Sequence, residues 1–144
     1  MSTCYAWGRF WEVGDASHDY SNRPNLSTGN AEDWYGHTSD GYERGSEPQL
    51  GAVACWADGP FSGDGHVAIV EEIHANGDIT CSNSAYGGAY FYLTTLSPPN
   101  YLPAAGYRFQ GFIYNPNGGG SPWWSRKIWM FKRALWHREE ELIK

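Results

Sequence analysis

The sequence feature that most constrains the fold is the segment GDGHVAIVEEIHANGDITCSNS at residues 63–84. Two stretches within it, 66–73 and 78–83, are rich in the β-branched and apolar residues that favour strands. The dipeptide Asn76-Gly77 lies between them, and Asn-Gly is typical of a two-residue hairpin turn. The segment therefore predicts two antiparallel strands joined by a tight turn.

The chain around this segment predicts further strands and one helix. Three more segments have strand composition, at 52–57, 89–95 and 108–114. Residues 4–13 carry apolar side chains at helical spacing, and Gly14 supplies a stop. From there to Pro48 the chain is dense in Asp, Ser, Asn, Gly and Pro, which indicates a loop with one short helix at 29–36. We predict an α+β domain in which an N-terminal helix packs on one antiparallel sheet.

Composition supports a single domain of this kind. The chain has 144 residues, 41% of them hydrophobic, which is enough for one core. Its 18 glycines, 8 prolines, 10 tyrosines and 8 tryptophans favour short strands joined by loops over a helical bundle. No apolar run approaches about 18 residues, and the first residues do not resemble a signal peptide. We therefore expect no membrane-spanning helix and no signal peptide in this chain.

The segment NPNGGGSP at 115–122 marks a boundary in the chain. Its glycines, prolines and serine indicate a flexible linker, which we place at 117–122, after a domain at 1–116. The remaining residues, 123–144, are basic and rich in Trp, with apolar residues at helical spacing. We predict an amphipathic tail helix that contacts its own domain, a partner subunit, a membrane or another anionic surface.

Charge excludes one class of partner. The formal net charge is −6, and before residue 121 the basic residues are few, namely Arg9, Arg23, Arg44 and Arg108. Binding of phosphate groups needs clustered Lys and Arg, so an acidic body is a poor nucleic-acid binder. We expect no nucleic acid among the partners.

The three cysteines, Cys4, Cys55 and Cys81, are an odd number and form no Cys-x-x-Cys pair. A disulfide framework or a structural zinc site is therefore disfavoured. Cys55 and Cys81 lie within predicted strands, where small buried hydrophobic residues are expected. Cys4 lies near the start of the predicted helix, outside the predicted strands.

His66 is the candidate for a catalytic imidazole. It begins a predicted strand after two glycines, which leave its ring accessible, and the predicted hairpin returns Ser82 or Asn83 to its level. A cysteine hydrolase needs a thiolate, an imidazole and a polar group that orients the imidazole. His66 and Asn83 are predicted to supply the second and third of these.

Six blocks of the sequence, in order, resemble the CHAP domain (cysteine- and histidine-dependent amidohydrolase/peptidase). They are YAWGRF, GNAEDWYG, PQLGAVACW, GDGHVAIVEEI, CSNSAYGG and FQGFIYNP, and the resemblance covers about residues 2–116. It implies a papain-like α+β fold that hydrolyses amide bonds of bacterial peptidoglycan. The activity would be that of an N-acetylmuramoyl-L-alanine amidase or a peptidoglycan endopeptidase. Such domains occur in phage endolysins, virion-associated lysins and secreted wall hydrolases.

The resemblance also implies roles for individual residues. It makes His66 the general base and Asn83 the residue that orients it, at a position where many relatives carry Glu. Four aromatic residues lie in blocks that usually flank the substrate groove, namely Trp34, Tyr35, Trp56 and Tyr86. The acidic calcium-binding loop of some relatives precedes the nucleophile, and this chain has no such segment, so we expect no metal and no cofactor.

The chain departs from the family at the nucleophile. Relatives usually open with Cys-Thr-x-Tyr-Ala-x-Gly-Arg, and aligning the Tyr with Tyr5 places Ser2 at the nucleophile position and Cys4 at the variable one. Either the catalytic Cys has been replaced by Ser, or a two-residue gap makes Cys4 the nucleophile. Helix geometry favours Ser2, since positions two apart point roughly 200° away from each other and cannot face the same His66.

Two other interpretations remain. A domain without the Cys could be a non-catalytic cell-wall-binding module that keeps the groove. A related NlpC-type peptidase fits less well, because Asn83 lies where that group usually has a second His. In each case we expect bacterial peptidoglycan as partner, with Gram-positive walls favoured, at the cell wall, outside the cell or in a phage virion; the tail helix could then contact the wall.

Overall fold

The structure is a computed structural model that describes residues 2–61, 63–84 and 91–118. A 13-residue helix, α1 (Ser2–Gly14), opens the chain, and three short 3₁₀ turns follow: η1 (Tyr20–Asn22), η2 (Ala31–Asp33) and η3 (Thr38–Asp40). Six strands come next: β1 (Arg44–Gly45), β2 (Val53–Asp58), β3 (His66–Ile73), β4 (Ile79–Asn83), β5 (Tyr92–Leu96) and β6 (Tyr107–Ile113). The predicted tail helix at 123–144 lies outside the described residues, as do most of the linker residues.

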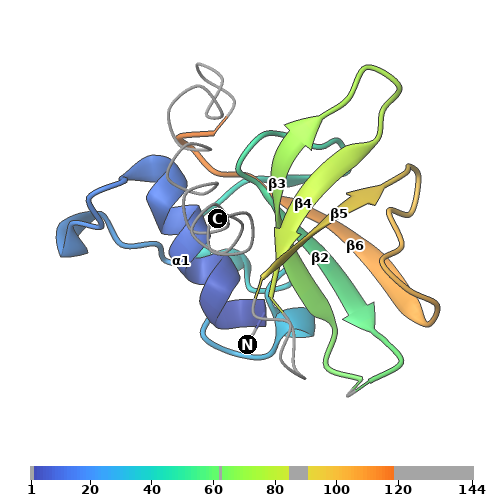
Figure 1. Cartoon of the computed structure of the whole chain (residues 1–144). Helices are drawn as coiled ribbons and strands as arrows, with labels where there is room; N and C mark the ends of the chain where they lie inside the picture. Colours follow the sequence, from blue (N-terminus) through green and yellow to red (C-terminus); the bar gives the residue numbers. More distant parts are fainter. Residues whose placement is uncertain (1, 62, 85–90, 119–144) are drawn as a thin grey trace, which may run out of the picture.

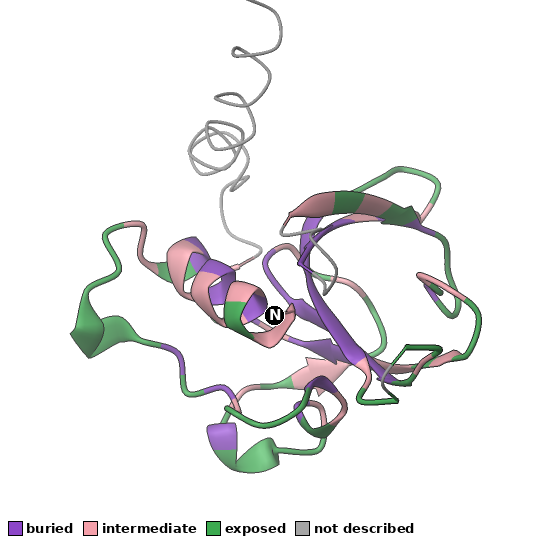
Figure 2. Ribbon diagram, turned by 60° about the horizontal axis from the view of Figure 1, so that its bottom comes forward, coloured by how far each residue is buried: buried purple, intermediate pink, exposed green. Residues whose placement is uncertain are grey.

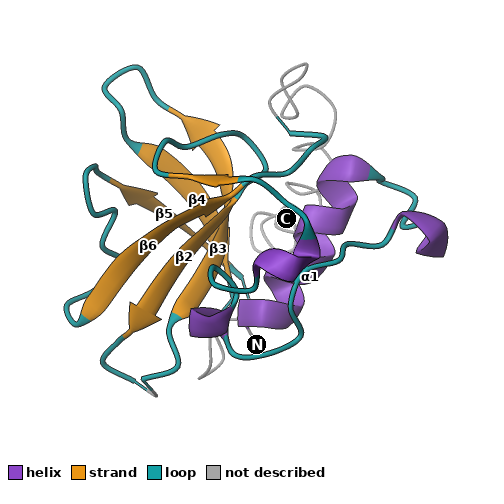
Figure 3. Ribbon diagram, turned by 180° about the vertical axis from the view of Figure 1, so that it is seen from behind, coloured by secondary structure: helices purple, strands orange, loops and turns teal. Residues whose placement is uncertain are grey.

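The strands form one sheet in the order β1-β6-β2-β3-β4-β5, and every neighbouring pair is antiparallel. Helix α1 covers one face of this sheet, as Figures 1 and 3 show from opposite sides. The predicted α+β arrangement of an N-terminal helix on an antiparallel sheet is confirmed. The short strand β1 was not predicted, and it lies within the segment that we expected to be a loop.

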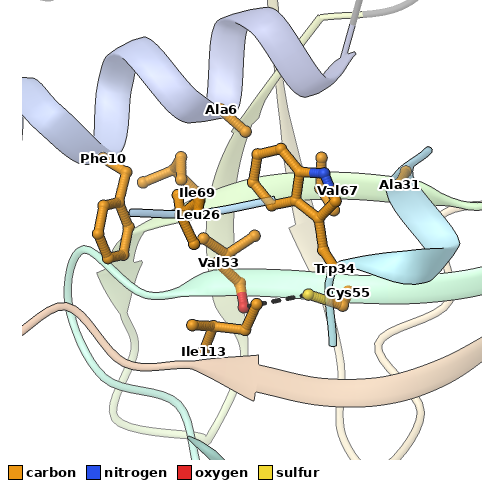
Figure 4. Packing of buried hydrophobic residues seen from close by; sticks show 10 residues of the cluster. All are labelled: Ala6, Phe10, Leu26, Ala31, Trp34, Val53, Cys55, Val67, Ile69 and Ile113. Atoms are coloured by element: carbon orange, nitrogen blue, oxygen red, sulfur yellow. Dashed lines mark hydrogen bonds between the residues drawn. The ribbon is translucent and has the colours of Figure 1, made fainter. Parts of the chain in front are cut away.

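The core is divided by the sheet into two layers, and the buried strand residues line its middle in Figure 2. The layer under α1 contains Ala6 and Phe10 of the helix, Trp34 of the following loop, and Val67 and Ile69 of β3 (Figure 4). The second layer lies on the opposite face, where the sheet curls around alanines of β2 and β3. Its larger members are Trp56, Val70, Ile79, Leu96, Tyr101 and Phe112. Buried apolar side chains on both faces explain why the central strands are nearly continuous apolar runs.

A bulge in β6 contributes to this curvature. The β2–β6 register shifts between Cys55 and Trp56, and Gly111 on the opposite strand has φ +142°. A Cβ atom at Gly111 would lie 2.7 Å from the ring of Tyr35, so a side chain there would collide with the loop. Bulges bend a strand and increase its twist, and glycine lets another group approach closely.

The hairpin between β3 and β4 differs from its prediction in turn length. The backbone N–H of His74 donates to Asp78 O at 2.8 Å and so closes a loop of residues 75–77. Gly77 has φ +96°, the left-handed conformation that a three-residue hairpin loop uses. The Asn-Gly pair therefore marks the turn correctly, but the loop has three residues and the predicted two-residue turn is wrong.

Candidate active site

His66 is held at the first position of β3 by the glycine before it. Gly65 has φ +79°, and a Cβ atom there would lie 2.3 Å from the carbonyl oxygen of Trp56. Its backbone N–H donates to Asp58 O at 2.8 Å, which closes the β2–β3 loop just before the histidine. Because only glycine combines this φ with this approach, Gly65 fixes the point at which His66 enters the sheet.

The imidazole of His66 is buried among aromatic rings. His66 pairs across the sheet with Trp56, and their rings stack with centroids 5.7 Å apart. The ring of Tyr107 lies 6.1 Å away, and only 6% of His66 is exposed. Burial lowers the pKa of His66 below its usual range, while its hydrogen bond to Asn83 acts in the opposite direction. The ring is therefore neutral at pH 7 and can accept a proton.

Asn83 fixes which nitrogen of the ring accepts that proton. Its Oδ1 lies 2.9 Å from His66 Nε2, while its Nδ2 lies 2.9 Å from Thr94 Oγ1 and 3.1 Å from the carbonyl oxygen of Cys81. A carbonyl oxygen can only accept, so the amide nitrogen must point toward Cys81 and the amide oxygen toward the ring. Nε2 therefore carries the hydrogen, and Nδ1 keeps the lone pair that a general base needs.

The register of the hairpin explains how these two side chains meet. Ser82 pairs with Ile69, three residues beyond His66 along β3. Asn83 follows Ser82 and projects to the opposite face of the sheet, where its amide reaches diagonally to the imidazole. Asn83 and His66 are thus in contact through their side chains, as predicted, although they are not cross-strand partners in the sheet.

Ser2 and Cys4 lie differently on α1. Ser2 begins the helix and shares a face with Ala6 and Arg9, both buried against the sheet, whereas Cys4 is exposed. Figure 1 shows the start of α1 at the same end of the domain as the start of β3 and the end of β4, the strands that α1 contacts most. In the described part of the chain, the Ser2 hydroxyl and the imidazole of His66 are not hydrogen-bonded to each other. Cys55 and Cys81 are buried, as predicted.

A cavity of about 320 Å³ opens beside the start of α1. Its walls come from the first turns of the helix and from the loop that leads into η2, and they include Thr3, Cys4, Trp7, Ser27, Thr28 and Trp34. The exposed Cys4 thus lines this cavity, whereas Ser2 is not among its lining residues. The lining combines aromatic carbon with hydroxyl groups, which suits a ligand that is partly apolar and partly polar.

The predicted groove aromatics occupy three different environments. Trp56 is fully buried and its ring stacks against that of His66, while Trp34 is 1% exposed yet borders the cavity. Tyr35 is half-buried and contacts β6 at Gly111. Tyr86 lies outside the described residues.

Sequence reasoning missed two residues that support the site. The glycines before His66 were expected to leave its ring accessible; that expectation is wrong, because only 6% of His66 is exposed, and Gly65 instead has a conformation that the structure requires. Thr94, which holds the Asn83 amide, carries no signal in the sequence, because it reaches the site only through the pairing of β4 with β5. Within the described residues, no group of three or more His, Cys, Asp or Glu side chains is arranged to hold a metal ion.

The fold and the contact between His66 and Asn83 define a class of protein. It is an α+β domain in which the N-terminal helix and the strand that begins with His66 both start at one end of the sheet. Comparison with known families agrees, because the profile of the CHAP domain matches residues 2–85. The chain belongs to the CHAP domain family.

Two curated proteins show how far the similarity extends. Over 61 residues the chain is 39% identical to "Probable autolysin LDP" of Staphylococcus aureus. This match covers 42% of this chain and 21% of that protein. Over 59 residues it is 39% identical to "Putative hydrolase" of Streptococcus mutans serotype c. This match covers 40% of this chain and 26% of that protein. The matches thus span only about a quarter or less of these relatives. No helix in the described ranges is long and apolar enough to cross a membrane.

Proposed function

We propose that this domain is a peptidoglycan hydrolase that cleaves wall amide bonds, with His66 as general base, Asn83 as its orienting residue and position 2 as the nucleophile. The observation that carries the proposal is the buried His66–Asn83 pair, with Nε2 engaged by Asn83 and Nδ1 left to accept a proton. Membership of the CHAP family and the name autolysin of one relative support peptidoglycan as substrate.

The proposed reaction follows from these groups. Nδ1 of His66 takes the proton of the nucleophile, which attacks the carbonyl carbon of the wall amide. The C–N bond then breaks, and the proton on the imidazole passes to the departing amine. Water attacks the acyl intermediate in the same way, which yields a carboxylic acid and restores the nucleophile.

Ser2 makes the chain as written a weak version of this enzyme. A Ser hydroxyl is a far weaker acid than a thiol, and a neutral imidazole paired with an amide is a modest base. Cys4 is a poorer candidate than Ser2, because it points into the cavity from another face of α1. We therefore assign Cys4 and Trp34 to the wall of the substrate groove rather than to the reaction.

A second candidate function rests on the same residue. With Ser2 at the nucleophile position, the domain could bind wall fragments in the cavity beside α1 without turning them over. The two functions share the groove and differ only in turnover, so a single experiment separates them.

The experiment compares the chain as written with Ser2→Cys on purified Gram-positive walls and measures newly released amines. We expect Ser2→Cys to increase release by orders of magnitude and Cys4→Ala to change it much less. Full activity of the chain as written, abolished by Cys4→Ala, would make Cys4 the nucleophile. Binding without release in both forms would support the non-catalytic module. Identification of the new end groups would distinguish amidase from endopeptidase.

A further inference from the structure

A buried ion pair joins the nucleophile helix to the sheet. Arg9 on α1 approaches Glu71 on β3 with two nitrogens: Nε lies 2.8 Å from Oε1, and Nη2 lies 3.1 Å from Oε2. Their side chains are 2% and 3% exposed. Two parallel N–H to oxygen bonds of this kind define both the distance and the orientation between the partners.

The carboxylate of Glu71 also contacts the third element of the candidate site. The hydroxyl of Ser82 on β4 donates to Glu71 Oε1 at 3.2 Å, and Ser82 immediately precedes Asn83. Glu71 itself lies on the strand that begins with His66. One buried carboxylate thus links the helix that begins at Ser2, the strand of the base and the strand of the orienting residue.

Stability alone is a weak reason for such a pair. Removal of two charges from water costs several kcal/mol, and apolar pairs of similar volume are often as stable or more so. Apolar contacts between α1 and the sheet, such as Ala6 over Val67, have no preferred direction. A shift of α1 by one residue would move Ser2 by about 1.5 Å and rotate it by about 100°. The two-bond contact of Arg9 with Glu71 opposes such a shift, because it requires one register.

We propose that Arg9 and Glu71 are positioning residues that hold the first residue of α1 in register with the imidazole of His66. The inference rests on the proposed function of position 2 and extends it to residues far from the reacting atoms. Arg9 also pairs with Glu12 on its own helix, and that contact cannot fix the helix relative to the sheet. The two carboxylates that bind the same guanidinium thus have different roles.

The test uses Ser2→Cys as the parent and replaces the pair by apolar residues, Arg9→Met with Glu71→Leu. Removal of both charges avoids a lone buried carboxylate, whose pKa burial would raise. Three quantities are measured: the thermal midpoint, the kcat and KM on soluble wall fragments, and the pH profile of alkylation of the thiol introduced at position 2. Mass spectrometry of peptide fragment ions distinguishes that thiol from Cys4, which lies two residues away in the same peptide.

We expect the double variant to keep a thermal midpoint close to that of the parent. Its kcat falls by about 10²-fold with KM within a few-fold, the loss typical of a misplacement of about 1 Å. The thiol at position 2 also titrates at higher pH, because it has lost its imidazole partner. If the double variant fails to fold, Arg9→Lys gives the second test, since Lys keeps the charge but cannot form the two parallel bonds. The same changes in kcat and thiol titration are expected there.

Two controls isolate the effect. Glu12→Gln removes the other carboxylate from the same guanidinium, and Val70→Ala destabilises β3 from the opposite face of the sheet. Both should leave the thiol profile unchanged. An unchanged thiol profile and kcat in the double variant and in Arg9→Lys would overturn the inference. Failure of the Ser2→Cys parent to cleave wall would instead refute the proposed function. The two failures can be told apart, because alkylation of the thiol needs no wall substrate.

Discussion

Asn83→Ala, made in the Ser2→Cys background, tests how the base is oriented. The substitution removes the acceptor for His66 Nε2–H and leaves that donor unpaired in a site where His66 is only 6% exposed. An unpaired buried donor costs about 1–3 kcal/mol, and the lost bonds to Thr94 and the Cys81 carbonyl add about 1 kcal/mol more. We expect a loss of about 3 kcal/mol in the free energy of unfolding, or roughly 10 °C in Tm.

The effect of Asn83→Ala on turnover should be smaller than that of removing the base. An orienting residue selects the ring nitrogen that carries the proton but takes no part in bond making. We expect kcat to fall about 10- to 100-fold, which corresponds to about 1.4–2.7 kcal/mol in the barrier. At a pH where the His66 ring is neutral, nitrogen NMR should show the hydrogen on Nε2 in the parent and a mixture of tautomers in the variant.

Thr94→Val provides the matched control for Asn83→Ala. It removes one partner of the Asn83 amide, at 2.9 Å, and leaves the bond between Asn83 Oδ1 and His66 intact. We expect a loss of about 1 kcal/mol in stability with kcat and tautomer nearly unchanged. A parent with the hydrogen on Nδ1, or an Asn83→Ala variant with unchanged kcat, would refute the assignment of the base.

Three further outcomes are expected. His66→Ala in the Ser2→Cys background should abolish amine release from walls while circular dichroism shows a folded domain; residual activity above a few per cent would exclude His66 as base. Deletion of residues 121–144 should leave Tm within a few degrees of that of the full chain, because Asn115 Nδ2 donates to Phe10 O at 3.0 Å and so anchors the end of the domain. A large fall in Tm would show that the tail completes the core. The free energy of unfolding of the chain as written should fall as the pH drops below 6.5, because burial lowers the pKa of His66 in the folded state and the unfolded chain then binds the proton first. Denaturant titrations of this chain and His66→Asn across pH 5–8 would check this, and parallel curves would contradict it.

The sheet could be predicted from the sequence because its strands have a strong local signature. The predicted ranges 52–57, 66–73 and 78–83 match β2, β3 and β4 to within one residue at either end. The strand expected at 89–95 instead begins at Tyr92, and β1 was missed, because a two-residue strand is formed by its partner rather than by its own composition. Local propensity identifies central strands well and edge strands poorly.

The candidate site was only partly predictable, for a physical reason. His66 and Asn83 lie on consecutive strands, so the spacing of one hairpin was enough to bring them together. The Arg9–Glu71 contact spans 62 positions and the Asn83–Thr94 bond crosses to β5, and neither follows from spacing. The environment of Trp56 was also hidden, because a buried aromatic ring and a groove aromatic have the same sequence signature.

The pKa of His66 offers a last test of why this site needs a thiol. In the chain as written, burial lowers the pKa of the imidazole, and Asn83 opposes that effect only through its hydrogen bond, because its amide carries no charge. A thiol at position 2 that ionises near neutral pH would give the imidazolium an anionic partner, and an opposite charge within a few ångströms favours the charged form. We therefore expect the pKa of His66 in Ser2→Cys to lie above its value in the chain as written, by NMR titration of the ring. Loss of this rise when the introduced thiol is alkylated would tie the effect to the thiolate. An unchanged His66 titration in Ser2→Cys would mean that position 2 does not face the ring, and the nucleophile would have to be sought elsewhere.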